Sequence, residues 1–188
     1  RLQSGDILID GAPRRLASPK DAIAAGIGLI SRDRRASLVP KFATGPNLSL
    51  PWLAGKPQLR LLDRTREAEE ARHYVAALRI EPPLPDREVM FFSGGNQQKV
   101  VLARWMSSGS RIVIFDEPAR GIDVGAKAEV FALMGDMARD GAAILMISSE
   151  PAEIEGMADR VLVLRKGRVV AELGRKDASQ ARLLEAAG

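Results

Sequence analysis

The chain has 188 residues, of which 46% are hydrophobic and 28% charged, a composition that is typical of folded globular proteins and excludes a disordered one. With no cysteine and a single histidine, His73, the sequence excludes disulfides, thiolate metal sites and sites built from several histidines. The formal net charge is +4, but basic and acidic residues are interleaved and only 4% of residues are aromatic, so we expect no nucleic-acid partner.

The N-terminal part predicts two short strands and one helix. Ile7–Ile9 is an apolar run that enters a tight turn at residues 10–11. Ser18–Asp21 predicts a helix start, because a capping serine is followed by a proline suited to the first turn and an aspartate favoured at the positive end. Gly26 ends this helix, and Ile27–Ile30 has the pattern of a buried strand.

The middle of the chain changes from loop to helix. Residues 31–62 contain several Pro and Gly residues without a clear period, so we expect mostly loop with short helical pieces. Apolar residues recur at helical spacing from Arg64 to Leu78, and the prolines within 82–85 end that helix. Another helix is expected from Gly95 onward. Its apolar positions are Val101, Leu102, Trp105 and Met106.

Strand and helix patterns alternate in the last part of the chain. The strand patterns are Ile112–Phe115, Ala143–Ile147 and Val161–Leu164, and the helix patterns are Gly125–Arg139 and the residues after Pro151. Because the strands are near-continuous apolar runs, this alternation predicts an α/β fold with a parallel sheet covered by helices on both faces. Residues 166–167 then turn the chain into a hairpin with Arg168–Val170.

Two adjacent carboxylates, Asp116 and Glu117, follow the strand pattern and precede Pro118. Ligands of open parallel sheets bind beyond the carboxyl ends of the strands. An aspartate there can hold Mg2+, and an adjacent glutamate can polarise a water for attack on a phosphoryl group. The alternative is that the acids only end the strand and that Pro118 enforces the exit of the chain.

The sequence Ser93, Gly94, Gly95 precedes a helix pattern and suits an anion. Paired glycines let the backbone approach a ligand, and a serine hydroxyl with the N–H groups of a helix N-terminus favours a phosphate. An ordinary helix cap would look the same, so the three residues alone leave both interpretations open. Their combination with Asp116 and Glu117 further along the chain favours a phosphate.

On these motifs the chain resembles the nucleotide-binding domains of ABC transporters. Phe92–Asn96 looks like the family's LSGGQ signature, with Phe for Leu and Asn96 for Gln. Asp116 and Glu117 match its Walker B magnesium ligand and catalytic base, and Gly121–Asp123 looks like the D-loop, whose Asp123 would communicate across a nucleotide dimer. The resemblance implies a P-loop NTPase-type parallel sheet with a helical insertion, and ATP and Mg2+ as cofactors.

Three segments are similar in sequence to the second cassette of bacterial importers for ribose, galactose and xylose. In those proteins two cassettes are fused in one chain. These segments are Ser93–Trp105, Asp116–Val130 and Ile147–Ile154. The resemblance implies an ATP-hydrolysing component of a monosaccharide importer, although nucleoside importers carry similar cassettes. Its partners would be another cassette, membrane permease subunits and, indirectly, a periplasmic sugar-binding protein. No apolar run approaches the roughly 20 residues of a membrane span. The resemblance implies a peripheral position on the cytoplasmic face of the bacterial inner membrane.

The family's phosphate-binding P-loop, GxxxxGK[ST], is missing from the sequence, since Gly55–Lys56 is followed by Pro57. We therefore expect a cassette truncated before its P-loop, unable to hydrolyse ATP alone, with an incomplete sheet whose exposed face is prone to aggregation. The resemblance further implies a helical part over about residues 36–107 and an ATPase core over about 1–35 and 108–188.

Two positions depart from the family pattern. Arg32 stands where the Q-loop glutamine is usual, and Ser149 where a switch histidine is usual. Arginine could reach a phosphate but cannot coordinate Mg2+, serine cannot supply an imidazole, and His73 is expected to be an ordinary helix residue. We therefore expect this cassette to have a weak site of its own and to donate Ser93, Gly94 and Gly95 to the partner's ATP.

Two other interpretations stay open at this stage. A DNA-repair type ABC ATPase shares both motifs, but such proteins carry long coiled coils between Q-loop and signature, and the segment from Arg32 to Ser93 has no sustained heptads. A non-catalytic ABC remnant or binding module is consistent with the missing P-loop.

Overall fold

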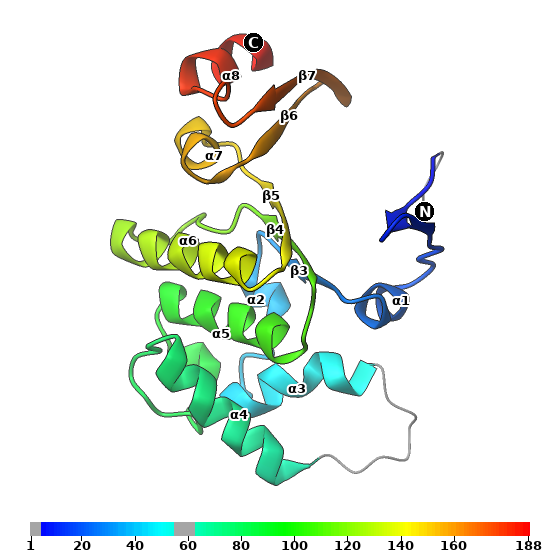
Figure 1. The fold of residues 1–188 in the computed structure, drawn as a ribbon. Helices are drawn as coiled ribbons and strands as arrows, with labels where there is room; N and C mark the ends of the chain where they lie inside the picture. Colours follow the sequence, from blue (N-terminus) through cyan, green and yellow to red (C-terminus); the bar gives the residue numbers. More distant parts are fainter. Residues whose placement is uncertain (1–4, 55–62) are drawn as a thin grey trace.

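A parallel sheet forms the centre of the molecule. The computed structural model describes residues 5–54 and 63–188. The sheet has the strand order β3–β4–β5. Its strands are β3 (Ile27–Ile30), β4 (Ile112–Asp116) and β5 (Ala143–Ile147). Ile30 lies opposite Phe115, which in turn lies opposite Met146. The predicted parallel α/β core is confirmed (Figure 1). The expectation that Val161–Leu164 also belongs to this sheet is wrong, because among the residues that the structure describes that segment pairs only with the strand that follows it, in a separate antiparallel hairpin.

Helices make up most of the remaining described chain. They are α1 (Pro19–Ala24), α2 (Arg34–Ser37), α3 (Thr44–Ala54), α4 (Arg64–Ala77), the 3-10 helix η1 (Val89–Phe91), α5 (Gly94–Ser107), α6 (Val124–Arg139), α7 (Pro151–Met157) and α8 (Gln180–Ala187). The serine cap predicted for α1 is confirmed, since the Ser18 hydroxyl accepts from the N–H of Asp21. The Asp21 carboxylate in turn accepts from the N–H of Ser18, which completes a capping box.

The prediction that residues 31–62 are mostly loop is partly wrong, because α3 is 11 residues long. Its helical propensity is low, with Gly45, Pro46 and Pro51 in the segment, so tertiary packing must stabilise it. Leu48 and Asn47 are fully buried where α3 packs on α4 and α5. Residues 55–62, with the Gly55–Lys56 pair, lie outside the described residues.

Helices α5 and α6 cover one face of the sheet, and α3 and α4 lie beyond α5 (Figure 1). Val113 and Phe115 point into this core and are fully buried. Helix α5 packs so closely on Gly28 of β3 that a Cβ added at this glycine would lie 2.8 Å from the Trp105 ring. The proposed division into a helical part over residues 36–107 and a core on either side of it stays a prediction.

The opposite face of the sheet is exposed, so the prediction of helices on both faces is wrong for the described residues. Leu29, Leu145 and Ile147 are 50%, 54% and 48% exposed. Side chains alternate along a strand, so these residues face away from Val113 and Phe115 and from the helices that cover them. The predicted exposed apolar face is present.

Two hairpins use the same turn chemistry. In β1 (Leu8–Ile9) and β2 (Ala12–Pro13) the turn residues are Asp10 and Gly11, and in β6 (Arg160–Arg165) and β7 (Arg168–Gly174) they are Lys166 and Gly167. All four turn residues have positive φ, as type I′ turns require. The φ angles are 52° at Asp10 and 75° at Gly11 in the first hairpin, and 51° at Lys166 and 77° at Gly167 in the second. Both predicted turns are confirmed, and α7 and α8 pack near β6 on its buried side.

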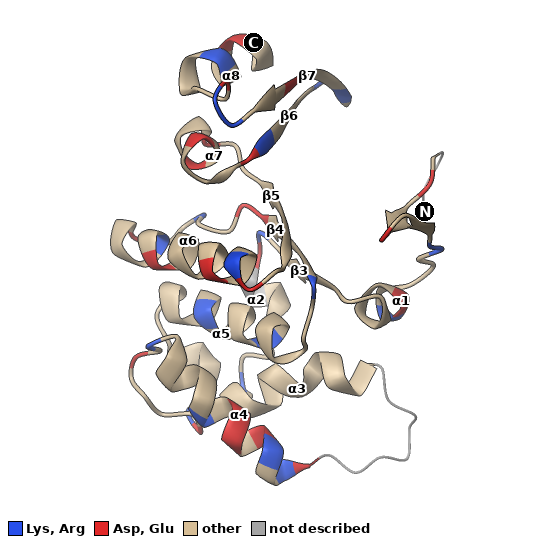
Figure 2. Ribbon diagram, in the orientation of Figure 1, with Lys and Arg blue, Asp and Glu red and all other residues tan. Residues whose placement is uncertain are grey.

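Charged residues of both signs are distributed over the molecule, and among the longer helices α3 carries none (Figure 2). None of the helices within residues 5–54 and 63–188 is long and apolar enough to cross a bilayer.

Candidate functional site

The carboxyl end of β4 places Asp116 and Glu117 side by side at the edge of the sheet. Glu117 has φ of 52°, a left-handed conformation that costs a non-glycine residue energy and is common at functional sites. Its N–H donates to the carbonyl of Ile147 at 2.9 Å, which continues the pairing of β4 with β5 beyond the strand. The turned backbone leaves the Glu117 side chain only 11% exposed, whereas that of Asp116 is 34% exposed.

Ser149 reaches Glu117 through its main chain. The N–H of Ser149 donates to Oε1 of Glu117 at 3.0 Å. Ser149, which the sequence predicts at the position of the family's switch histidine, therefore contacts the carboxylate through a group that every residue other than proline supplies. The hydroxyl of the neighbouring Ser148 instead donates to Glu153 at 2.5 Å.

Ion pairs of Lys127, which the sequence did not indicate, hold the segment that follows Ser149. Nζ of Lys127 lies 2.6 Å from Oε1 of Glu153 and 2.7 Å from Oε2 of Glu150. The hydrogen bonds to Glu150 and Glu153 raise the pKa of Lys127, so the ammonium stays charged. The sequence gives no local signal for these contacts, because Lys127 is on α6 and its partners lie 23 and 26 residues further along, at the start of α7.

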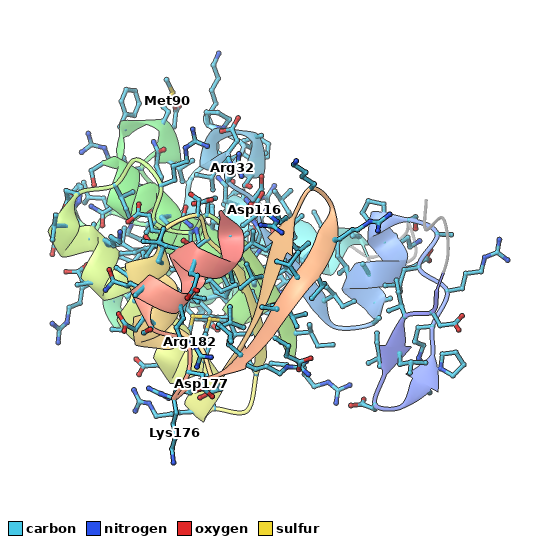
Figure 3. All side chains as sticks on the ribbon, turned by 90° about the horizontal axis from the view of Figure 1, so that it is seen from above. Arg32, Met90, Asp116, Lys176, Asp177 and Arg182 are labelled. Atoms are coloured by element: carbon cyan, nitrogen blue, oxygen red, sulfur yellow. The ribbon has the colours of Figure 1, made fainter. Side chains whose placement is uncertain are left out.

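Arg32 follows β3 and lies near Asp116 (Figure 3). Its Nη2 lies 3.7 Å from Oδ1 of Asp116 and 4.0 Å from Oε1 of Glu117. These distances are those of ion pairs rather than hydrogen bonds. The structure thus brings together Arg32, Asp116, Glu117 and Ser149, all predicted as site residues and spread over more than 100 positions of the sequence.

The carboxylates alone do not make a good metal site. Their oxygens are the donors that Mg2+ prefers, but a cationic guanidinium lies 3.7 Å from Oδ1 of Asp116. Within the described part of the chain, no group of three or more His, Cys, Asp or Glu residues could hold a metal ion. The residues present therefore do not fit Mg2+ while Arg32 occupies this position.

Ser93 begins the signature segment as the N-cap of α5. Its Oγ accepts from the N–H of Asn96 at 3.3 Å and from Nδ2 of Asn96 at 3.0 Å. Ser93 is exposed and Gly94, the first helical residue, is half-buried. Ser93 and Gly94 thus form the part of the predicted signature that is open to a ligand.

Gly95 and Asn96 contact neighbouring segments of the chain. Gly95 is buried against α6, where an added Cβ would lie 2.7 Å from the Cβ of Ala126. Oδ1 of Asn96 accepts from the N–H of Glu81 at 3.0 Å, and Nδ2 of Asn96 donates to the Glu81 carbonyl at 2.8 Å. These contacts fix the start of α5 against α6 and against the chain that follows α4.

Asp123 is the N-cap of α6. Its Oδ1 accepts from the N–H of Ala126 at 2.9 Å, and the residue is exposed. Since Ala126 also packs on Gly95, the helix that Asp123 begins lies directly beside the start of the signature helix. His73, by contrast, is exposed on α4, where its ring packs edge-on against Tyr74 with a centroid distance of 4.9 Å.

The fold and these motifs define an ATP-binding cassette. The fold resembles that of the ADP conformation of MJ1267, an ATP-binding cassette of an ABC transporter, with a TM-score of 0.81 and 17% identity over 98% of this chain and 76% of that one. It also resembles the ATP-binding cassette MJ0796 in a dimeric post-hydrolysis state bound to ADP and Pi, with a TM-score of 0.75 and 19% identity over 92% of this chain and 74% of that one.

The chain belongs to the ABC transporter family, whose model matches residues 1–120. It is 45% identical to the ribose import ATP-binding protein RbsA 1 of Rubrobacter xylanophilus over 96% of its length. It is 39% identical to the arabinose import ATP-binding protein AraG of Pseudomonas syringae pv. syringae over 100% of its length. In both comparisons the chain spans 37% of the length of the relative.

Proposed function

We propose that this chain is the second cassette of the ATP-hydrolysing component of a bacterial monosaccharide importer. In this proposal it donates its signature to ATP held by a partner cassette. The observation that carries the proposal is the exposed Ser93 hydroxyl at the N-terminus of α5. The names of the related ribose and arabinose import proteins favour a sugar over a nucleoside.

The start of α5 is suited to a phosphate for two reasons. The first N–H groups of a helix of 14 residues have no partner within the helix, and the helix dipole places positive potential there. The Ser93 hydroxyl adds a rotatable donor beside them. Gly95 and Asn96 hold this start rigidly against α6 and Glu81, so the donors are oriented before a ligand arrives.

The remaining assignments rest on this proposal. ATP with Mg2+ would be held mainly by the partner cassette, Asp123 would face the cassette interface, and Asp116 and Glu117 would belong to this chain's own, weaker site. Permease subunits would be direct partners and a periplasmic sugar-binding protein an indirect one. The chain would lie on the cytoplasmic face of the bacterial inner membrane as a peripheral component.

The proposal is tested with Ser93→Ala in the assembled transporter. Loss of one hydroxyl donor to a charged phosphate should lower transport-coupled ATPase activity roughly ten- to a hundred-fold. Ser179→Ala is a matched control, because Ser179 caps α8 and accepts from the N–H of Arg182 at 3.4 Å, much as Ser93 caps α5.

Both variants lose a helix cap, but only the Ser93 variant should lose activity. Near-normal ATPase activity of Ser93→Ala would show that the signature of this chain does not act on ATP. An equal loss in Ser179→Ala would assign the effect to stability.

A further inference from the structure

We propose that Arg32 is a built-in cation of the Asp116–Glu117 pair, taking the charge-balancing place of a divalent ion so that these carboxylates bind metal only weakly. The inference rests on the proposed function in treating this pair as the chain's own, weaker ATP site. It adds a physical cause for the weak site. Both carboxylates are present, and the positive charge of one guanidinium lowers their affinity for a metal ion.

The sheet register places Arg32 at the carboxylates. Strands β3 and β4 are parallel neighbours, and Ile30 lies opposite Phe115. Arg32 is two residues beyond Ile30 and Glu117 two residues beyond Phe115, so both leave the sheet at the same level. The pairing of β3 with β4 therefore fixes the backbone position of Arg32, and only the side chain can change its conformation.

The guanidinium is positioned to neutralise both acids. Its Nη2 is 3.7 Å from Oδ1 of Asp116 and 4.0 Å from Oε1 of Glu117. A divalent ion bound to Asp116 would lie within a few ångströms of this positive charge and would be repelled by it. Arginine also has no lone pair to offer a metal, so it cannot join the coordination sphere as a glutamine would.

Glu117 has a further partner that keeps its carboxylate in place. Oε1 accepts the N–H of Ser149 at 3.0 Å, and the segment of Ser149 is held in turn by Lys127 through Glu150 and Glu153. The Glu117 carboxylate is thus held by a group other than Arg32, and the backbone of Asp116 is held by its place at the end of β4. Removing the guanidinium should consequently unmask the pair without displacing it.

The test uses the 188-residue chain without nucleotide, with Mn2+ as the probe and the electron paramagnetic resonance signal of free Mn2+ as the readout. Arg32→Gln and Arg32→Met should each bind one Mn2+ at least about ten-fold more tightly than the unsubstituted chain, because the repulsion is gone. Arg32→Lys keeps the positive charge, so its Mn2+ affinity should stay as low as that of the unsubstituted chain. Arg32→Gln combined with Asp116→Asn should lose the gained affinity.

Arg182→Gln is the matched control. Arg182 pairs with the single carboxylate of Asp177 at 2.8 Å, and its side chain is 56% exposed, against 51% for Arg32. The substitution therefore also removes one positive charge from an exposed ion pair. Mn2+ affinity of this variant should equal that of the unsubstituted chain, and circular dichroism should show the same fold for all variants.

Equal Mn2+ affinity in the unsubstituted, Arg32→Gln and Arg32→Met chains would overturn the proposal. An equal gain in Arg182→Gln would also overturn it, since net charge would then be the cause. Neither result bears on the role of Ser93, because the measurement involves no ATP and no partner cassette.

Discussion

Arg104 is a buried charge that binds carbonyl oxygens of two other helices. The residue is 6% exposed, and its Nε and Nη2 donate to the carbonyl and to Oδ1 of Asn47 at 2.7 and 3.0 Å. Its Nη1 donates to the Ser37 carbonyl. Burial lowers the pKa of Arg104 to about 10, so it remains protonated at neutral pH. This side chain ties α5 to α2 and α3.

Arg104→Met should therefore lower the free energy of unfolding by about 2–4 kcal/mol, because it leaves buried carbonyl and amide oxygens without their charged donor. Urea unfolding followed by circular dichroism measures this change. Arg72→Met, at an exposed position of α4, should change stability by less than about 0.5 kcal/mol. Similar losses in both variants would contradict the structural role of Arg104.

At the scale of elements, the contact between α5 and α6 depends on a glycine. An added Cβ at Gly95 would lie 2.7 Å from the Cβ of Ala126, a separation that two carbon atoms cannot adopt without movement. Lys99 strengthens the same contact, since its Nζ is 2.6 Å from Oε2 of Glu129 on α6 and donates to the Arg79 carbonyl at 3.0 Å. The signature helix is thus fixed to the helix that Asp123 begins.

Gly95→Ala should separate the two helices and cost about 1–3 kcal/mol of unfolding free energy. Gly135→Ala is the control, because Gly135 is inside α6 and an added Cβ would meet nothing within 4 Å. That variant should gain roughly 0.5–1 kcal/mol from helix propensity. Thermal unfolding distinguishes the two, and a Gly95→Ala variant as stable as Gly135→Ala would refute the close contact.

At the scale of the whole molecule, the uncovered sheet face is the main departure from an ordinary α/β domain. Leu29, Leu145 and Ile147 form this face, and each is about half exposed. An exposed apolar area on a sheet promotes self-association. On β6, Leu162 and Leu164 are also exposed, at 45% and 64%.

Leu145→Thr should reduce self-association of the 188-residue chain, as measured by sedimentation velocity, because it removes apolar area while keeping a strand-favouring residue. Leu184→Gln is the control, since Leu184 is 60% exposed but lies on α8. This control should leave the sedimentation profile unchanged. An unaltered profile for Leu145→Thr would mean that the sheet face does not drive association.

Much of the fold could be predicted from the sequence, because the relevant signals are local. Apolar runs and helical periods placed the strands and most helices, and the pairs Asp10–Gly11 and Lys166–Gly167 predicted turns that only positive φ can form. The serine caps at Ser18 and Ser93 were readable for the same reason, since a cap is decided by its next three residues.

The site was only partly predictable. The sequence identified Ser93, Asp116 and Glu117 as candidates, but only the tertiary structure places Arg32 against the acids, Lys127 against α7 and Asn96 against Glu81. Each of these contacts joins residues far apart in the chain, and no local pattern encodes which side chains will meet.

What the sequence determined by itself was therefore the class of fold and the motifs of an ABC cassette. The tertiary structure decided that α3 is helical, that one face of the sheet is uncovered and that the carboxylates carry their own cation. The reason is that propensity, capping and turns depend on neighbouring residues, whereas burial and ion pairing depend on which distant segments the folded chain brings together.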